Sequence, residues 1–310
     1  MLLIDPLLPP KRCFAECITC SLKTSEARKP QLFTQTNVNN IISSLEERAP
    51  KGIKVNGVLV WGCGDPLTLV NIYEVTLSLR AFMGSHDMGR KLYLHTSLLG
   101  LLNAYSRSTE GSLRRNIEFL IQQVDAFVVP FLWYGHERFL LGWPQDKNFS
   151  QYLELLKSVA KDHEDKLLME IHVFKVAENI YPERVHLDEV VTSLRHIKVE
   201  TLVLKPIDRP SPSPRVKPVA DTYVERVRSY LSDEGFSVHV DKMALPTAPP
   251  QWNKVANVLY NQLLRMPLKY LEVKSIYGDL GIIALNNLLS KNLVSRITWS
   301  GEVYFWGRNT

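Results

Sequence analysis

The sequence predicts an α/β fold built on a parallel sheet, followed by a small α+β unit. Five apolar runs of strand length lie between residues 57 and 206, and stretches of helical period alternate with them. With a first strand that ends just before Cys13, they give six strand–helix units. Such units form a parallel sheet covered by helices, either doubly wound or curled into a barrel. Six units are fewer than the eight of a closed barrel.

The strands are expected at residues 57–62, 91–96, 125–131, 167–174 and 201–206. The helices are expected at residues 37–47, 69–83, 110–123, 150–162, 186–196 and 219–232. The stretch 37–47 shows why, since a Thr/Asn start precedes Val38, Ile41 and Leu45 at helical spacing. Because ligands of parallel α/β folds gather at the C-terminal ends of the strands, functional residues are expected at that edge.

The C-terminal part of the chain is expected to be a separate unit. Residues 205–218 hold five prolines and are expected to form a stiff loop at the functional edge of the sheet. The stretch 245–252 is typical of a linker with few contacts across it. It divides the chain into a core domain at 1–244 and a small domain at 253–310. Three helical runs and a terminal hairpin in the small domain are typical of a winged helix.

The composition is that of a soluble globular protein, with 45% hydrophobic and 22% charged residues. The net charge of +5 indicates no polyanionic partner by itself, although seven Lys/Arg against three Asp/Glu fall within residues 253–310. The apolar start carries Asp5 and three prolines rather than a signal-peptide pattern, and no run of about 18 apolar residues occurs. We therefore expect a cytoplasmic protein without a membrane partner.

Three of the four cysteines, Cys13, Cys17 and Cys20, lie within eight residues. In a reducing cytosol such a cluster indicates metal or redox chemistry more than disulfides, although cysteines also serve as small core residues. Structural zinc usually takes two closely spaced ligand pairs, whereas the fourth cysteine, Cys63, lies over forty residues away. Four-iron clusters take four thiolates, so a loop that gives three leaves one iron open to a small molecule.

The spacing Cys13-x3-Cys17-x2-Cys20, on a loop after the first strand, resembles the signature of radical S-adenosylmethionine (radical SAM) enzymes. The stretch 62–66, Gly-Cys-Gly-Asp-Pro, looks like the family's glycine-rich motif, and Thr96 matches its strand-end motif. The chain is most similar to the archaeal and bacterial members related to the wyosine-forming tRNA-modifying enzyme, through the lysine-proline-x-x-arginine-proline stretch that starts at Lys205. The resemblance covers roughly residues 3–242 and implies a partial (β/α)6, TIM-like barrel.

The resemblance implies an enzyme in which Cys13, Cys17 and Cys20 ligate a 4Fe–4S cluster. Cys63 is either a fourth ligand, which would leave no open iron, or a small residue between two glycines, and we favour the second because closure would make the glycine turn unnecessary. A ferredoxin- or flavodoxin-like electron donor would reduce the cluster, which cleaves S-adenosylmethionine (SAM) to a 5′-deoxyadenosyl radical. The radical would abstract hydrogen from a substrate that the sequence does not identify, an RNA-related one being an option. This chemistry belongs to the oxidoreductases or transferases. The residues expected to bind SAM are Gly62, Gly64, Asp65 and Thr96.

Some positions depart from the family pattern and bear on how SAM is held: Thr19 replaces an aromatic residue, Asp65 a glutamate, Ser97 an asparagine and Pro130 a serine.

Further candidates lie near other strand ends. Glu170 and His172 share a face of their strand and are expected inside the barrel, as substrate contacts or as a satisfied interior pair. Candidates for binding an anion are Lys205, Asp208 and Arg209. Candidates for lining the mouth, or for a solvated loop, are Trp133, Tyr134, His136 and Arg138.

A different class of function is a non-catalytic regulator, with an iron–sulfur or zinc sensor domain joined to a winged helix. The basic C-terminal unit carries aromatic residues on its hairpin, among them Trp299 and Tyr304, which could contact nucleic acid. Alternating aromatic residues are more typical of a hairpin core, and the third helical run offers only Lys291 as a cation for base reading. We therefore favour a lid, a dimer contact or a partner-docking surface over nucleic-acid binding.

Overall fold

The computed structural model describes most of the chain, and every structural statement below concerns these residues. They are residues 2–7, 11–22, 34–48, 55–86, 89, 91–102, 118–131, 142–143, 148–161, 166–241 and 255–308. Within these ranges no helix combines the length and the apolar character that crossing a membrane would require.

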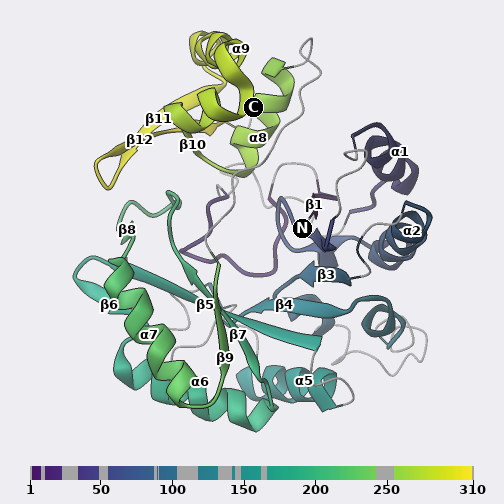
Figure 1. Cartoon of the computed structure of the whole chain (residues 1–310), viewed down its shortest axis with the longest axis vertical. Helices are drawn as coiled ribbons and strands as arrows, with labels where there is room; N and C mark the ends of the chain where they lie inside the picture. Colours follow the sequence, from purple (N-terminus) through teal and green to yellow (C-terminus); the bar gives the residue numbers. More distant parts are fainter. Residues whose placement is uncertain are drawn as a thin grey trace.

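Seven parallel strands form the main sheet, in the order β1-β2-β3-β4-β5-β7-β9 (Figure 1). The strands lie side by side in the order in which they occur in the sequence. Each crossover therefore leads to the next strand on the same side. The crossover helices lie along the outer side of the strands in Figure 1, as right-handed crossovers require. The bounds are β1 (Leu2–Ile4), β2 (Gly57–Val60), β3 (Lys91–His95), β4 (Ala126–Pro130), β5 (Leu167–Val176), β7 (Thr201–Pro206) and β9 (Ser237–Val240).

The strands are mostly apolar because one face packs under the crossover helices, while alternate residues of β3 and β7 on the other face are only partly buried. Val58 of β2 pairs with Leu2 on one side and Leu92 on the other. Met169 of β5, fully buried, lies between Val129 and Leu202 in the same way. The helices that cover the sheet are α1 (Val38–Arg48), α2 (Ile72–Ser85), α5 (Phe149–Lys161), α6 (Arg184–Ile197) and α7 (Asp221–Asp233).

Strand β5 extends beyond its parallel neighbours and also pairs with two short antiparallel strands, β6 (Asn179–Tyr181) and β8 (Val216–Lys217). The proline-rich stretch 205–218 therefore starts as the end of β7 and returns to the sheet at β8. The loop between them carries Arg209 and Ser211, which are buried although they are polar. This loop is an ordered wall beside the ends of the strands.

Residues 255–308, here called the tail, contain α8 (Val255–Arg265), α9 (Tyr270–Ser290) and a three-stranded antiparallel sheet. Helix α9 is interrupted at Gly278, whose φ of 63° is not helical, so the two expected helical runs are both present. The turn of the hairpin has positive φ at Ser300 and Gly301, as a type I′ turn requires. The strands are β10 (Leu268–Lys269), β11 (Val294–Trp299) and β12 (Glu302–Gly307).

The tail has a core of its own around Leu259, Leu263 and Val273, but its hairpin joins the main core. Trp299 and Tyr304 are buried against the main unit, and the Trp299 indole N–H donates to the carbonyl of Val216 at 2.7 Å. These contacts differ from the expectation that few contacts would cross between the two units. The linker 245–252 itself lies outside the described residues, so the domain boundaries stay a prediction.

The expected parallel α/β sheet is confirmed, and its five central strands lie within two or three residues of their predicted positions. The first strand ends at Ile4 rather than just before Cys13, because Asp5 turns the chain by accepting a hydrogen bond from the amide of Leu7. Strands β6, β8, β9 and β10 were not expected. Of the helix expected at 110–123, only residues 118–123 are described, and they are helical.

Candidate functional site

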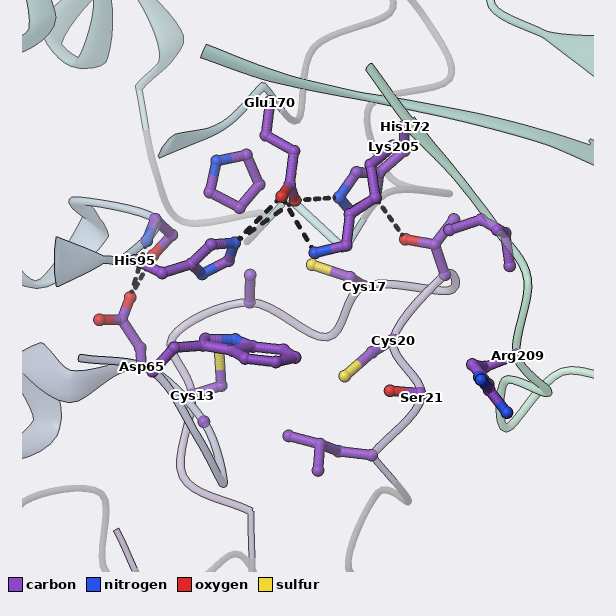
Figure 2. Close-up of a pocket in the computed structure, with 18 of the residues that line it drawn as sticks. Cys13, Cys17, Cys20, Ser21, Asp65, His95, Glu170, His172, Lys205 and Arg209 are labelled. Atoms are coloured by element: carbon purple, nitrogen blue, oxygen red, sulfur yellow. Dashed lines mark hydrogen bonds and ion pairs between the residues drawn. The ribbon is translucent and has the colours of Figure 1, made fainter. Parts of the chain in front are cut away.

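A cavity opens at the C-terminal edge of the sheet, where the residues predicted to be functional converge (Figure 2). One wall is the segment 11–22, which carries the cysteines. The strand ends of β2, β3, β4, β5 and β7 form the rest of the wall, together with the start of the loop after β7. The strand-end residues that line it are Trp61, Gly64, Asp65, His95, Thr96, Ser97, Pro130, Glu170, His172, Lys205, Pro206, Ile207, Asp208 and Arg209.

Cys13, Cys17 and Cys20 all line this cavity and are partly buried. Their segment has no helix or strand of its own, and backbone contacts to other segments hold it. The amide of Arg12 donates to the carbonyl of Cys63 at 3.0 Å, and the amide of Glu16 donates to the carbonyl of Gly142 at 3.3 Å. A turn between the amide of Cys20 and the carbonyl of Cys17, 3.1 Å apart, closes the end of the segment.

The three thiols share one electrostatic environment with Lys11. Burial, reinforced by the Asp65 carboxylate, raises the pKa of Cys13 to about 12. Burial and the neighbouring Cys13 raise the pKa of Cys17 as well. Burial opposes the charge of Lys11, but the attraction of the three cysteines outweighs it and raises the pKa of this amine. Three cysteines that line one cavity together with Lys11 fit a positively charged iron cluster, which would stabilise their thiolates.

Within the described ranges, no three His, Cys, Asp or Glu side chains gather as closely as a single metal ion requires. Cys63 does not line the cavity. It is 2% exposed, its amide donates to Asp5 Oδ1 at 3.2 Å, and burial together with Asp5 raises the pKa of its thiol to about 12.

The glycines of the motif 62–66 are needed because other parts of the chain approach their backbone closely. A Cβ on Gly62 would lie 1.8 Å from Asp5 Oδ1, and one on Gly64 would lie 1.7 Å from the carbonyl oxygen of Arg12. Gly64 also has a φ of 128°, which other residues rarely adopt. The sequence predicted that these glycines let a ligand come close to the backbone. In the structure, Asp5 and Arg12 of the same chain lie against them. Gly64 lines the cavity, whereas Gly62 does not.

Asp65 holds the ends of two strands together. Its carboxylate accepts hydrogen bonds from the amide of Leu67 at 3.0 Å and from the hydroxyl of Thr96 at 2.6 Å. It also accepts from the amide and the hydroxyl of Ser97, at 3.0 and 2.6 Å. Thr96 and Ser97 are therefore buried and bound to Asp65. This ties the turn after β2 to the end of β3, beside the cavity.

Glu170 lies at the centre of a buried polar network at the back of the cavity, shown by the dashed lines in Figure 2. Its carboxylate accepts from Lys205 Nζ at 3.0 Å and contacts His172 Nε2 at 2.6 Å. His95 Nε2 lies 3.3 Å from the same carboxylate. Burial opposes the charge of Glu170, but Lys205 and the two histidines outweigh it and hold its pKa well below the usual range. This arrangement is the satisfied interior pair considered from the sequence, enlarged to four residues.

The network reaches the cysteine segment through Thr19. The Oγ1 of Thr19 lies 2.7 Å from His172 Nδ1, so one imidazole contacts Glu170 on one side and Thr19 on the other. Lys205 also lies over the Trp61 ring, 5.2 Å from its centroid. Sequence reasoning missed His95 and Trp61. Their only signal in the sequence was their position, since each is the next-to-last residue of a predicted strand.

The other anion-binding candidates are also paired. Arg209 Nη1 donates to Glu272 Oε2 at 2.6 Å, and this buried guanidinium therefore links the cavity wall to the tail. Asp208 lies beside it, with 3.9 Å between Asp208 Oδ1 and Arg209 Nε. The mouth candidates Trp133, Tyr134, His136 and Arg138 lie outside the described residues.

No family model matches the sequence, and no curated protein does. The fold is similar to crystal structures of Streptococcus suis SuiB, one of them bound to S-adenosylmethionine. The TM-scores are 0.53 and 0.54 at 16% and 15% identity, and the match covers 80% of this chain. The chain spans about half of the SuiB length, 52% and 51%. A structure of spore photoproduct lyase with bound AdoMet and dinucleoside spore photoproduct is similar at 14% identity and a TM-score of 0.45. The match covers 76% of this chain and 75% of the lyase chain. The comparison with SuiB shows a shared fold.

Proposed function

We propose that this protein is a radical SAM enzyme, with Cys13, Cys17 and Cys20 as the thiolate ligands of a 4Fe–4S cluster. The observation that carries the proposal is their convergence on one cavity with the Gly64–Asp65 turn and Thr96. The similar SuiB structure was solved with S-adenosylmethionine bound, which supports the same ligand here. When bound, the cluster would supply one electron to SAM, breaking its C5′–S bond to give methionine and a 5′-deoxyadenosyl radical that removes hydrogen from a substrate.

The residues of this chain would hold SAM and shape the space around it. We assign the backbone at Gly64, which lines the cavity, to the amino group of SAM. Gly62 would shape the turn beside Asp5, and the hydrogen bond between Asp65 and Thr96 would keep that turn in place. The Glu170 network would fix the wall opposite the turn, because it joins three strand ends into one buried unit. A closed polar wall of this kind excludes water from a reactive site.

The finer architecture belongs to the same proposal. Chain-order strands with helices on the outer side support a partial (β/α)6 barrel, and the helices and hairpin of the tail support a winged-helix-like unit. The domain boundaries would be 1–244 and 253–310. The lysine-proline motif at Lys205 supports kinship with the wyosine-related group. The further partners would be a ferredoxin- or flavodoxin-like electron donor and an unidentified substrate.

Two observations weigh on the alternatives. A zinc-sensor regulator has less support, because the similar SuiB structure was solved with S-adenosylmethionine bound. Nucleic-acid binding through the hairpin rings has less support as well, because Trp299, Tyr304, Phe305 and Trp306 are all at most 5% exposed. Base stacking needs an accessible ring face.

The test is anaerobic reconstitution with iron and sulfide, followed by electron paramagnetic resonance of the reduced protein with and without SAM. We expect a broad absorbance near roughly 400 nm, typical of iron–thiolate chemistry, and a paramagnetic signal that SAM alters. Dithionite should then drive formation of 5′-deoxyadenosine, measured by chromatography. Cys17→Ala should abolish all three observations. Stoichiometric zinc in protein kept anaerobic, or a cluster that neither responds to SAM nor cleaves it, would refute the proposal.

A further inference from the structure

Two partly buried ion pairs join the tail to the main unit, one at Arg209, which lines the cavity, and one at Asp5, which contacts the turn 62–66. Arg265, the last residue of α8, pairs with Asp5, directly after β1. Glu272, in the first turn of α9, pairs with Arg209, just after β7. Only seven positions separate Arg265 from Glu272 in the chain, yet their partners follow strands at opposite ends of the sheet. In the described sheet β1 is one edge strand, and β7 is followed only by the other edge strand, β9.

The contact with Asp5 leads directly to the motif 62–66. Asp5 Oδ2 pairs with Arg265, while Asp5 Oδ1 accepts from the amide of Cys63 at 3.2 Å. The same Oδ1 lies where a Cβ of Gly62 would be. The carbonyl of Cys63 then accepts from the amide of Arg12, one residue before the first cysteine. A side chain of the tail is thus two hydrogen-bonded steps from the backbone of the glycine turn.

The second contact holds the opposite wall. The Arg209 side chain is 7% exposed and lines the cavity, and its Nη1 contacts both Glu272 and, at 3.4 Å, the carbonyl of Pro267. Burial opposes the charge of Arg209, but Glu272 outweighs it and raises the pKa of the guanidinium. The Tyr304 hydroxyl adds a contact with the carbonyl of Asp208 at 3.3 Å. Figure 1 shows the tail beside this edge of the sheet, with α8 toward β1 and the hairpin toward β8.

We infer that the tail holds the Asp5 side and the Arg209 side of the cavity at a fixed separation, a role here called the brace. Arg265 and Glu272 would then be positioning residues for SAM. In the described sheet no strand pairs β1 with β9, so the sheet alone does not hold the loop after β1 at a fixed distance from the loop after β7. Two ion pairs from one short segment fix the separation of the Asp5 and Arg209 sides. The inference rests on the proposed function, because it names SAM as the ligand whose site is held.

The experiment uses the full-length chain with Arg265→Gln, with Glu272→Gln and with both changes. The control is Lys274→Gln, because this cation of α9 pairs with Asp279 at 3.8 Å and is not among the described residues that line the cavity. In protein without a cluster, hydrogen exchange should become at least about fivefold faster at residues 61–65 for Arg265→Gln and at residues 207–211 for Glu272→Gln. Exchange in α5 and α6 should stay unchanged. Arg265→Lys should restore part of the protection.

In reconstituted protein, the double variant should keep the wild-type iron content and raise the KM for SAM by about tenfold, with kcat for 5′-deoxyadenosine formation within about twofold. Unchanged exchange at both segments would overturn the brace, and so would equal acceleration throughout the chain, which indicates loss of stability only. An unchanged KM alongside faster exchange would overturn the assignment to SAM. If the wild-type protein binds no SAM, the proposed function fails, and the exchange measurement still decides whether the brace exists.

Discussion

Asp65→Asn is the substitution that most directly tests the description of the glycine turn. The Asp65 carboxylate is 3% exposed and accepts from two backbone amides and two hydroxyls. An asparagine keeps the shape but replaces one oxygen by an NH2 group, which cannot accept. Whichever way the amide is oriented, the NH2 faces a backbone N–H, either that of Leu67 or that of Ser97.

The cost follows from that mismatch. A hydrogen bond to a charged acceptor contributes about 1.5–3 kcal/mol, and a buried donor left without an acceptor costs about 1–3 kcal/mol. Because the two effects overlap, we expect a loss of about 3 kcal/mol in the free energy of unfolding. For a unit of this size each kcal/mol lowers Tm by about 2–4 °C, so the expected decrease is about 6–12 °C.

The assay is thermal unfolding of the protein without a cluster, followed by circular dichroism, so that the result does not depend on the proposed chemistry. Ser97→Ala is the control, because it removes the hydroxyl bond to Asp65 and the long 3.3 Å bond from the Leu99 amide to that hydroxyl, and leaves the Leu67 and Ser97 amides paired with Asp65. Its Tm should fall by less than half as much. A decrease below about 2 °C for Asp65→Asn, or one no larger than that of Ser97→Ala, would refute the picture of a saturated buried carboxylate.

Three further predictions concern other residues. Trp299→Ala should cost about 3–5 kcal/mol, and Trp299→Phe clearly less, because the indole is buried and bonded to Val216; equal Tm values for the two variants would contradict this. Burial raises the pKa of Tyr277 to about 12. The unfolded chain therefore loses this proton first, near pH 10, and about 1 kcal/mol of stability should be lost by pH 11. Tyr277→Phe should remove that loss in unfolding measured from pH 9 to pH 11, and an unchanged pH slope would argue against it. Cys63→Ala should keep the cluster and its response to SAM, whereas a variant without iron would make Cys63 a ligand.

The sequence was sufficient for the five central strands of the main sheet, because each is a short apolar run followed by a helical pattern of its own. The strands that it missed are of a different kind. Strands β6 and β8 are two or three residues long, and only the extension of β5 beyond its neighbours gives them a partner. Strand β9 lies at the edge of the sheet and is partly exposed along its length, so its sequence lacks the continuous apolar run of the central strands.

At the site, the sequence predicted which residues lie at the functional edge better than it predicted which side chains they contact. The strand-end rule placed Asp65, Thr96, Glu170 and Lys205 at one edge, and the structure has all four lining the cavity. Spacing along the chain cannot show that Glu170 contacts side chains from β3 and β7, because those contacts depend on the register between strands. Composition likewise could not show that Arg209 is neutralised by Glu272, 63 residues later in the chain.

The cysteine segment shows how such long-range contacts shape a site. Segment 11–22 contains no helix or strand, so its own hydrogen bonds cannot fix the positions of three side chains. Its supports come from elsewhere: Cys63 and Asp65 contact the backbone of Arg12, and His172 contacts Thr19. The first support holds the chain before Cys13, and the last holds it between Cys17 and Cys20. The separation of the thiols is therefore set by the turn after β2 and by β5, which the parallel sheet keeps at a fixed distance. A substitution at His172 would move a cysteine that lies more than 150 residues away in the sequence, because the imidazole contacts the loop on one side and a buried carboxylate on the other.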